Sequence, residues 1–344
     1  MNNYDAADPS PLAAALVAIL RPVLGPVTVG PVERLKGGYS REMWSFDAWA
    51  AEAPSRPLIL CTDSAVSVVS SHEAGLDRVR EAALLHTLHT AGLPVPDAIA
   101  SGPARGPLGR PFFVMERRPG TAAIAPLHHD PWYVEHRDQL TRQFAAMLAA
   151  IHRAEVGDAI LGRRPTSDEV APQALARWAA ELAATDGART PTLDRAVVWL
   201  GAHLPPAPPR VTLVHGDYRT GNILHGRGGS EPDGLQVVLD WELAHFGDPL
   251  EDVAWAQLVC WRVGTDRVGG LATLEEWSAA YGAATGVPVD AVRLRFWEVL
   301  ASVKMAALMW RAARTVTAGA ERALLERLFK DLGDELDRRL LVDR

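Results

Sequence analysis

The residues whose types and spacing best fit a chemical reaction lie between positions 213 and 250. Two apolar segments, 211–214 and 235–239, have the composition of short buried strands, and a polar loop joins them. The side chains there that could act on a substrate or a metal ion are, in chain order, His215, Asp217, Asn222 and Asp240. Phosphoryl transfer from a nucleotide needs a carboxylate that orients a hydroxyl, and an Asn and an Asp that hold a metal ion. The stretch therefore predicts a kinase-like centre.

Each of these residues has an expected role. Asp217 is the expected catalytic base, because a carboxylate on this loop can accept the proton of a substrate hydroxyl. Asn222 and Asp240 offer oxygen ligands of the kind that Mg²⁺ takes in proteins. The spacing H-x-D-x-x-x-x-N, which starts at His215, matches the catalytic loop of protein kinases, with Gly216 in place of its Arg. We expect His215 to hold the loop backbone rather than to react.

Two other interpretations of the loop have less support. A strand-end turn without chemistry would explain any one of these residues, but not their order and spacing before a strand that ends in Asp240. A metal-dependent hydrolase would need a second His at ligand spacing, and the sequence contains no HExxH or paired-His motif. It also contains neither the GxxxxGK[ST] motif of P-loop enzymes nor the GxSxG motif of many hydrolases.

Four segments in the first third of the chain have the composition of strands. They span residues 27–35, 42–49, 58–62 and 111–116. Gly37 and Gly38 indicate a turn between the first two segments. A helix is expected over residues 75–91, where Gly92 and Pro94 end it.

The chain after Glu116 is predicted to be mainly helical, and Arg117-Arg118-Pro119-Gly120 has the composition of a hinge. Helices are expected over residues 130–154, 173–184, 193–203, 289–317 and 320–341, and from the capping box that starts at Thr273. We therefore predict an α+β fold of two lobes. Residues 1–116 form an antiparallel sheet with one helix that covers a nucleotide, and residues 117–344 form a mainly helical lobe with the catalytic loop and acceptor site.

The bulk composition is that of a globular protein of the cytoplasm. The 344 residues are 48% hydrophobic, and the net charge of −7 argues against a nucleic-acid partner. No signal peptide is evident, and no apolar segment reaches the roughly 18 residues of a membrane span. Cys61 and Cys260 are expected to be buried free thiols, with a disulfide as the alternative. We expect a monomer or homodimer that does not bind membranes.

The sequence resembles the aminoglycoside phosphotransferase-like family, also called the choline kinase or homoserine kinase-like group. The motifs HGDYRTGNIL and VLDWELAHFGDPLEDVAW carry the resemblance, which extends from LKGGYSREMWSF to the terminal helices. The most similar branch includes the kinase-like domains fused to some acyl-CoA dehydrogenases. The resemblance implies a protein-kinase-like fold, with five antiparallel strands and one helix in the N-terminal lobe. The loop motif is specific for the family, but it does not identify the substrate.

The resemblance also implies a reaction and the residues for it. The expected activity is that of a small-molecule kinase, with Mg²⁺, ATP or GTP as the donor, and a hydroxyl of a small metabolite as the acceptor. Asp217 matches the catalytic base, and Asn222 and Asp240 match the metal ligands. The residues matched to nucleotide binding are Gly37, Gly38 and Ser40 on the turn over the phosphates, Glu81 on the helix, and Glu116 and Arg117 in the hinge segment 113–117. Lys36, on the same turn, is a further candidate that does not stand at a position of the family's pattern.

One basic residue of the family's pattern is absent. The third strand reads LILCTD, so that Cys61 stands where a Lys or Arg would contact the phosphates and pair with Glu81. Three basic residues could replace it, namely Arg34, Lys36 and Arg41. If none of them does, the alternative function is a nucleotide- or ligand-binding pseudokinase with weak or no transfer.

The acceptor side is less clear from the sequence. Four tryptophans on the later helices are expected to be mostly core residues, namely Trp255, Trp261, Trp297 and Trp310. Lys304, Arg311 and Arg314 lie on one side of the long helix, where a solvated face is expected and an anion site is the alternative. Arg219 could neutralise an anionic substrate or be solvated, and Asp248 is expected to cap a helix. The absence of a dense acidic cluster in the tail disfavours a polycationic acceptor.

Overall fold

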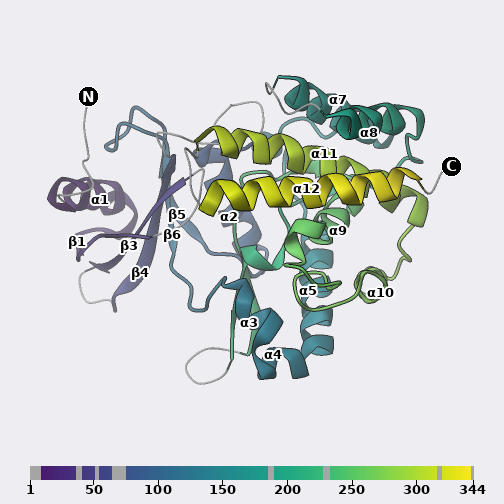
Figure 1. Ribbon diagram of the computed structural model, residues 1–344. Helices are drawn as coiled ribbons and strands as arrows, with labels where there is room; N and C mark the ends of the chain where they lie inside the picture. The colour runs from purple at the N-terminus through teal and green to yellow at the C-terminus, as the bar shows by residue number, and fades with distance from the viewer. Residues whose placement is uncertain are drawn as a thin grey trace. The chain divides into compact units, whose positions relative to one another are not determined.

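The computed structural model describes residues 9–35, 41–50, 54–63, 75–184, 190–227, 233–315 and 320–341 (Figure 1). The chain forms two compact units. The first unit consists of Met1–Gly120, Ala159–Leu161 and Val237–Leu243, and the second consists of Thr121–Asp158, Gly162–Gln236 and Ala244–Arg344. Residues 237–243, which include the predicted metal ligand Asp240, thus fold with the first unit although they follow the catalytic loop in sequence.

The first unit is built on an antiparallel sheet that has six strands within the described residues. Its main path runs in the order β1 (Val27–Val29), β3 (Arg41–Ala50), β4 (Arg56–Asp63), β6 (Phe112–Glu116) and β5 (Ala98–Gly102), and β2 (Glu33–Arg34) pairs with β3. Because successive strand residues point to opposite faces, Phe46 and Ala48 on β3 and Leu58 and Leu60 on β4 enter the core at every second position.

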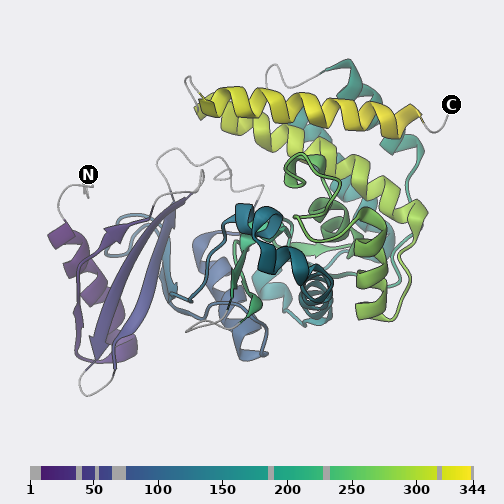
Figure 2. The ribbon, with the colours of Figure 1, turned by 60° about the horizontal axis from the view of Figure 1, so that its bottom comes forward.

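Two helices cover this sheet. Helix α1 (Pro9–Leu24) runs along it (Figure 2) and buries Leu12, Leu16 and Leu20, which are spaced at four residues and so lie on one face. Helix α2 (Arg78–Thr90) begins at Asp77, whose side chain accepts the N–H groups of Val79 and Arg80 at 2.9 Å. Helix α2 contacts β5 and β6, so the sheet determines the position of its charged residues as well as its leucines.

The second unit is mainly helical. Its helices are α3 (Ile124–His129), α4 (Pro131–Glu135), α5 (Arg137–Arg153), α7 (Ser167–Ala183), α8 (Pro191–Ala202), α9 (Leu250–Ala256), α10 (Leu274–Thr285), α11 (Ala291–Thr315) and α12 (Ala320–Leu341), with the short α6 (Asp158–Leu161) at the boundary and the 3₁₀ turns η1 (Thr220–Asn222) and η2 (Val259–Trp261). Helices α11 and α12 lie side by side (Figures 1 and 2), and α11 also packs on α7, α8 and α9.

Two small antiparallel ribbons frame the catalytic loop. Strand β7 (Thr212–Val214) pairs with β10 (His245–Gly247), so that Val214 lies opposite His245. Strand β8 (Ile223–Gly226) pairs with β9 (Gly234–Val238). The segment 215–222 therefore starts where one ribbon ends and stops where the other begins, which fixes both of its ends.

The predicted α+β fold, with an antiparallel sheet and a mainly helical second part, is confirmed. Three of the differences from the prediction have a clear physical reason. The segment 27–35 divides into β1 and β2, because Pro31 has no N–H to donate to a ladder. The segment 130–154 divides into α4 and α5 at His136, whose ring nitrogen hydrogen-bonds the carbonyl of Trp132. Strand β5 was missed, because the sequence AIASG has small residues and a weak strand signal.

The remaining global predictions concern cysteines and membranes. Cys61 and Cys260 are both free and buried, as expected. No helix among the described residues has the length and apolar character that crossing a membrane requires. The turn at Gly37 and Gly38 lies outside the described residues.

Candidate active site

The backbone of the catalytic loop is held by one buried carboxylate. Asp252, on the first turn of α9, accepts the N–H of His215 at 2.7 Å and the N–H of Gly216 at 2.8 Å. Gly216 has φ +83°, a left-handed conformation that a residue with a side chain adopts only with strain. His215 then accepts the N–H of Asp217 at 3.1 Å through Nδ1, so it braces the loop as expected.

Asp252 is itself fixed by partners within the second unit. It is fully buried, and it accepts a hydrogen bond from Nε2 of His152 at 3.1 Å, while the other ring nitrogen of His152 contacts the Tyr281 hydroxyl at 2.7 Å. Burial alone would raise the pKa of Asp252, but the hydrogen bonds and charges of His152 and His215 outweigh it and hold that pKa below its ordinary value. The carboxylate is therefore ionised where it clamps the loop.

Asp217 is surrounded by hydrogen-bond donors on the same unit. Trp255 Nε1 donates to Asp217 Oδ1 at 2.6 Å, and Asn222 Nδ2 donates to Asp217 Oδ2 at 2.6 Å and to the Asp217 carbonyl at 2.9 Å. The Asp217 side chain is 16% exposed, so its orientation is fixed while one edge meets solvent. Trp255 was predicted to be a core residue. Its indole is buried, but its N–H is also a functional contact that the spacing of tryptophans could not indicate.

Arg219 also contacts the carboxylate of Asp217. Its Nε lies 3.2 Å from Asp217 Oδ1, and its guanidinium lies over the ring of Trp261, 4.5 Å from the ring centroid. The side chain is 26% exposed, so Arg219 is not simply a solvated loop residue. Its guanidinium therefore helps to fix the position of the Asp217 carboxylate.

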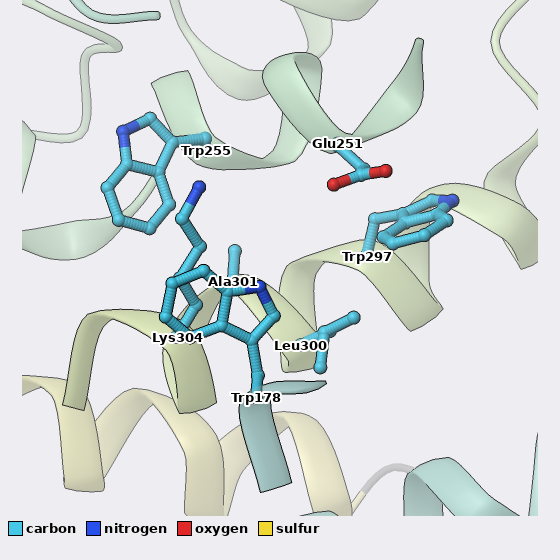
Figure 3. Close-up of a pocket in the computed structure, with 7 residues that line it drawn as sticks. All are labelled: Trp178, Glu251, Trp255, Trp297, Leu300, Ala301 and Lys304. Carbon is cyan, nitrogen blue, oxygen red and sulfur yellow. The ribbon is translucent and has the colours of Figure 1, made fainter. Parts of the chain in front are cut away.

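Two residues that contact the loop, Trp255 and Lys304, also line a small pocket (Figure 3). It is lined by Trp178, Glu251, Trp255, Trp297, Leu300, Ala301 and Lys304. Nζ of Lys304 donates to the carbonyl of Gly216 and lies 4.1 Å from the ring centroid of Trp255 and 5.4 Å from that of Trp178. Buried charges of opposite sign thus hold both ends of Gly216, since Asp252 binds its N–H and Lys304 its carbonyl.

The solvated stripe expected at Lys304, Arg311 and Arg314 was wrong for the first two residues. Lys304 is 7% exposed, and burial lowers its pKa to about 8. Arg311 forms an ion pair with Glu181 at 2.6 Å, and the side chain of Arg314 lies outside the described residues. The reason is tertiary: α11 is covered by several other helices, so that its polar side has protein neighbours where an isolated helix would have water.

We expect Lys304→Met to raise the free energy of unfolding at pH 7 by about 1–2 kcal/mol while it weakens catalysis. Because the pKa of Lys304 is lowered, the buried ammonium destabilises the folded protein below about pH 8. This destabilisation amounts to about 3 kcal/mol of unfolding free energy. Met removes that destabilisation but also removes the hydrogen bond to Gly216, which offsets about 1–2 kcal/mol. Urea unfolding at pH 7 measures the difference.

The pH dependence provides the control for this variant. Between about pH 8 and pH 10.5 the unfolded wild type binds more protons at Lys304 than the folded wild type does, so wild-type stability rises with pH there. The advantage of Lys304→Met should therefore disappear toward pH 10.5. A variant that is less stable than the wild type by the same amount at every pH would contradict the expectation.

In the first unit, Asp240 and Glu81 lie in one cluster of charges. Asp240 has φ +68° and its Oδ1 is 2.8 Å from Nη2 of Arg41. Arg41 also pairs with Glu81 through Nη1 at 3.0 Å and with Glu242 through Nε at 3.1 Å. Burial alone would lower the pKa of Arg41, but the charges of Asp240, Glu242 and Glu81 outweigh it and raise that pKa above its ordinary value.

A second arginine stabilises the same cluster. Arg78 pairs with Glu81, with Glu242 at 3.0 Å and with Asp63 at 2.7 Å, and it is 4% exposed. Cys61 lies close to these charges but is fully buried, and burial raises its pKa to about 12. It is therefore a neutral thiol that cannot replace a cation.

Of the three expected substitutes for the missing basic residue, Arg41 is the one that the structure brings to Glu81. Arg34 pairs with Glu42 at 3.1 Å and is 51% exposed, and Lys36 lies outside the described residues together with Gly37, Gly38 and Ser40.

Glu116 and Arg117, at the end of β6, are not part of this cluster. Glu116 lies 3.8 Å from Arg56, and Arg117 pairs with Asp47 at 2.8 Å and donates to the hydroxyl of Ser45. Their backbone N–H groups donate to the carbonyls of Asp97 and Pro57.

Asn222 in the second unit and Asp240 in the first each offer an oxygen of the kind that Mg²⁺ binds. The nitrogen of the Asn222 amide donates to Asp217, which leaves its oxygen as the atom that a cation would bind. Asp240 Oδ1 is buried and makes no well-formed hydrogen bond. Within the described ranges, no group of three His, Cys, Asp or Glu side chains forms a metal site. Mg²⁺ bound to a nucleotide does not need one, because water and phosphate oxygens supply most of its ligands.

Two further predictions for the helical part were that Asp248 caps a helix and that most of the tryptophans lie in the core. Asp248 accepts the N–H of Leu250 at 2.9 Å at the start of α9, as a capping residue does, and it also pairs with Arg293 at 2.6 Å. Trp255 and Trp297 are each 2% exposed and so belong to the core, as expected.

The chain is similar to known proteins over most of its length. It is 27% identical over 291 residues to acyl-CoA dehydrogenase family member 10 from Mus musculus, a match that covers 80% of this chain and 26% of that protein. A solved structure from Ralstonia eutropha has a TM-score of 0.68 and 21% identity, over 96% of this chain and 98% of that one. The chain spans about a quarter of the length of the mouse protein.

The same fold occurs in an aminoglycoside phosphotransferase. The GDP complex of aminoglycoside 2'-phosphotransferase-IIIa has a TM-score of 0.60 and 14% identity, over 95% of this chain and 99% of that one. A sequence model described as the phosphotransferase enzyme family matches residues 34–297. That range includes the charge cluster of the first unit, the whole catalytic loop and Asp252, and it is well over half of the chain. The protein therefore belongs to the phosphotransferase enzyme family.

Proposed function

We propose that this protein transfers the γ-phosphoryl group of ATP or GTP to a hydroxyl group of a small-molecule acceptor. The observation that supports this proposal best is Asp217, whose carboxylate is oriented by Trp255, Asn222 and Arg219 on a loop clamped by buried charges. Such an arrangement is typical of a group that positions a hydroxyl for transfer. In this proposal residues 1–116 cover the nucleotide, and residues 117–344 bind the acceptor.

In the proposed reaction, Asp217 accepts a hydrogen bond from the acceptor hydroxyl and takes its proton as the new phosphate ester forms. Trp255 and Asn222 keep the carboxylate in place, so no reorganisation is needed when the hydroxyl arrives. Arg219 pairs with the same carboxylate and adds to its orientation. The phosphoryl group leaves the β-phosphate oxygen and bonds to the acceptor oxygen, so the products are a nucleoside diphosphate and a phosphate monoester.

The nucleotide ligands are proposed from the family pattern. Asn222 and Asp240 would hold Mg²⁺, which neutralises the charge of the phosphates during transfer. Glu81 would position a basic residue, and the remaining proposed contacts are Lys36, Gly37, Gly38, Ser40, Glu116 and Arg117.

The experiment that tests the proposal incubates the purified protein with Mg²⁺, γ-labelled ATP or GTP, and a panel of hydroxyl metabolites. Transfer of label to one acceptor, dependent on Mg²⁺, is the expected result. Isothermal titration with ATP and GTP, each with Mg²⁺, identifies the donor independently of the acceptor. Absence of nucleotide binding with either donor would contradict the proposed function.

A nucleotide-binding pseudokinase is the second candidate, and the neutral thiol of Cys61 favours it. It predicts Mg²⁺-nucleotide binding with no transfer to any acceptor or to water. The two candidates therefore give different results in the same assay, since binding is common to both and labelled product is specific to the kinase.

A further inference from the structure

The position of Arg41 on the sheet suggests how the first unit compensates for Cys61. We propose that Arg41 supplies, from strand β3, the positive charge for the nucleotide phosphates that position 61 on strand β4 does not supply. This inference rests on the proposed function, and it names the residue that completes its phosphate site. Arg41 would bind phosphate oxygens directly, while Glu81 holds its guanidinium in place.

The strand register explains how the side chain of Arg41 on β3 can replace a basic side chain at position 61 on β4. Met43 of β3 lies directly opposite Cys61 of β4, and Arg41 lies opposite Asp63. Directly opposite residues point to the same face of an antiparallel sheet, and so do residues two apart on one strand. Arg41 and Cys61 are therefore diagonal neighbours on one face, and a long side chain can span the distance between such neighbours.

One guanidinium nitrogen of Arg41 faces the carboxylate that is proposed to bind the metal ion. Its Nη2 atom is buried and makes no well-formed hydrogen bond, although Asp240 Oδ1 is 2.8 Å away, and that oxygen is also without a well-formed hydrogen bond. A guanidinium carries five N–H donors and matches the geometry of phosphate oxygens. The donor proposed for phosphate and the carboxylate oxygen proposed for the metal ion thus face each other at ion-pair distance.

The charges of the cluster favour a bound cation and an anion together. The four carboxylates are those of Asp63, Glu81, Asp240 and Glu242, and the two guanidiniums are those of Arg41 and Arg78. The formal charge of minus two leaves an excess of carboxylate that a divalent cation would neutralise. Arg78 already pairs with Glu81 and Glu242, so these carboxylates have a second cation and do not depend on Arg41 alone.

The decisive experiment measures the affinities of Mg²⁺-ATP and of adenosine for four forms of the full chain, by isothermal titration. The forms are the wild type, Arg41→Met, Arg78→Met, and the double variant Arg41→Met with Cys61→Lys. We expect Arg41→Met to weaken Mg²⁺-ATP binding by roughly 10- to 100-fold, the effect of a lost hydrogen bond to a charged group, and to leave adenosine binding unchanged. The double variant should recover most of the ATP affinity, because its lysine stands on the neighbouring strand.

Arg78→Met is the matched control for loss of the cluster's structure. It removes an equally buried guanidinium from Glu81 and Glu242, so it should lower the thermal midpoint without a selective loss of ATP over adenosine. Equal losses of ATP and adenosine affinity in Arg41→Met would show a purely structural role and overturn the assignment. Tighter Mg²⁺-ATP binding in Arg41→Met would also overturn it, because Arg41 would then be blocking Asp240.

The failure of this inference and the failure of the proposed function give different results. Wild-type protein that binds Mg²⁺-ATP, with unchanged affinity in Arg41→Met, overturns the role of Arg41 alone. Wild-type protein that binds neither ATP nor GTP overturns the proposed function, and the role of Arg41 with it.

Discussion

Replacing Asp217 with Ala is expected to lower nucleotide-dependent phosphoryl transfer by about 10²- to 10⁴-fold, the usual contribution of a positioned acid–base group. The carboxylate is the acceptor for Trp255 Nε1 and Asn222 Nδ2, so its removal leaves no group of this loop to orient the hydroxyl. Because Asp217 acts on the acceptor, kcat should fall while the affinity for Mg²⁺-ATP changes little. Labelled-phosphate transfer and isothermal titration measure the two quantities separately.

The control variant is Asp331→Ala on α12. The side chain of Asp331 is 41% exposed and lies 3.9 Å from Arg327, so its ion pair is long. The substitution removes an exposed carboxylate and should leave transfer unchanged. Asp217→Asn keeps the shape of the side chain but not its charge, and it should be nearly as inactive as Asp217→Ala. Full activity in either variant would show that Asp217 is not the base.

Replacing Asp252 with Ala is expected to lower the free energy of unfolding by about 3–5 kcal/mol, the usual cost of removing one partner from a buried charged network. The N–H groups of His215 and Gly216 and the ring of His152 would lose their acceptor inside the second unit. The loop that carries Asp217 would also lose its clamp, so that transfer should fall even where the variant stays folded. Urea unfolding at pH 7 measures the loss of stability.

The pH dependence of the free energy of unfolding tests this prediction. The pKa of Asp252 in the folded protein is held below its ordinary value by His152 and His215, against the effect of burial. Its contribution is therefore complete above the unfolded pKa of about 4, and it is lost as the pH falls through the folded pKa. The stability gap between the wild type and Asp252→Ala should narrow as the pH falls below about pH 4.

A matched variant separates charge from shape at this position. Asp252→Asn keeps one acceptor oxygen for the loop, so we expect an intermediate loss of stability. If Asp252→Ala were as stable as the wild type at pH 7, the hydrogen bonds of Asp252 to His215 and Gly216 would not stabilise the loop.

Much of the catalytic loop could be predicted because its information is local. The order His215, Asp217, Asn222 depends only on spacing within one short segment, and the structure brings these three residues together by hydrogen bonds between near neighbours. The helices at the capping box of Thr273 and over residues 320–341 were also predicted, since caps and periodicity are local signals. The residues over which these helices extend therefore follow from the nearby sequence.

The contacts that hold the loop could not be predicted, because they join residues far apart in sequence. Asp252 lies 37 residues from His215, and Lys304 lies 88 residues from Gly216. Nothing in the sequence near Lys304 distinguishes it from the solvated lysine that its helix face suggested. Only the packing of α11 against other helices removes water from that face and lowers the pKa of Lys304.

The sequence by itself therefore determined the family, the α+β fold and the candidate base, because all three follow from motifs and from periodicity along the chain. It also showed that Cys61 interrupts the phosphate-binding pattern, and it named Arg41 as one of three possible substitutes. Only the tertiary structure placed Arg41 on the face of Cys61 and beside Glu81, through the strand register, while Lys36 lies outside the described residues. A residue's reach across a sheet depends on which strands pair and in what register, and neither is written in the local sequence.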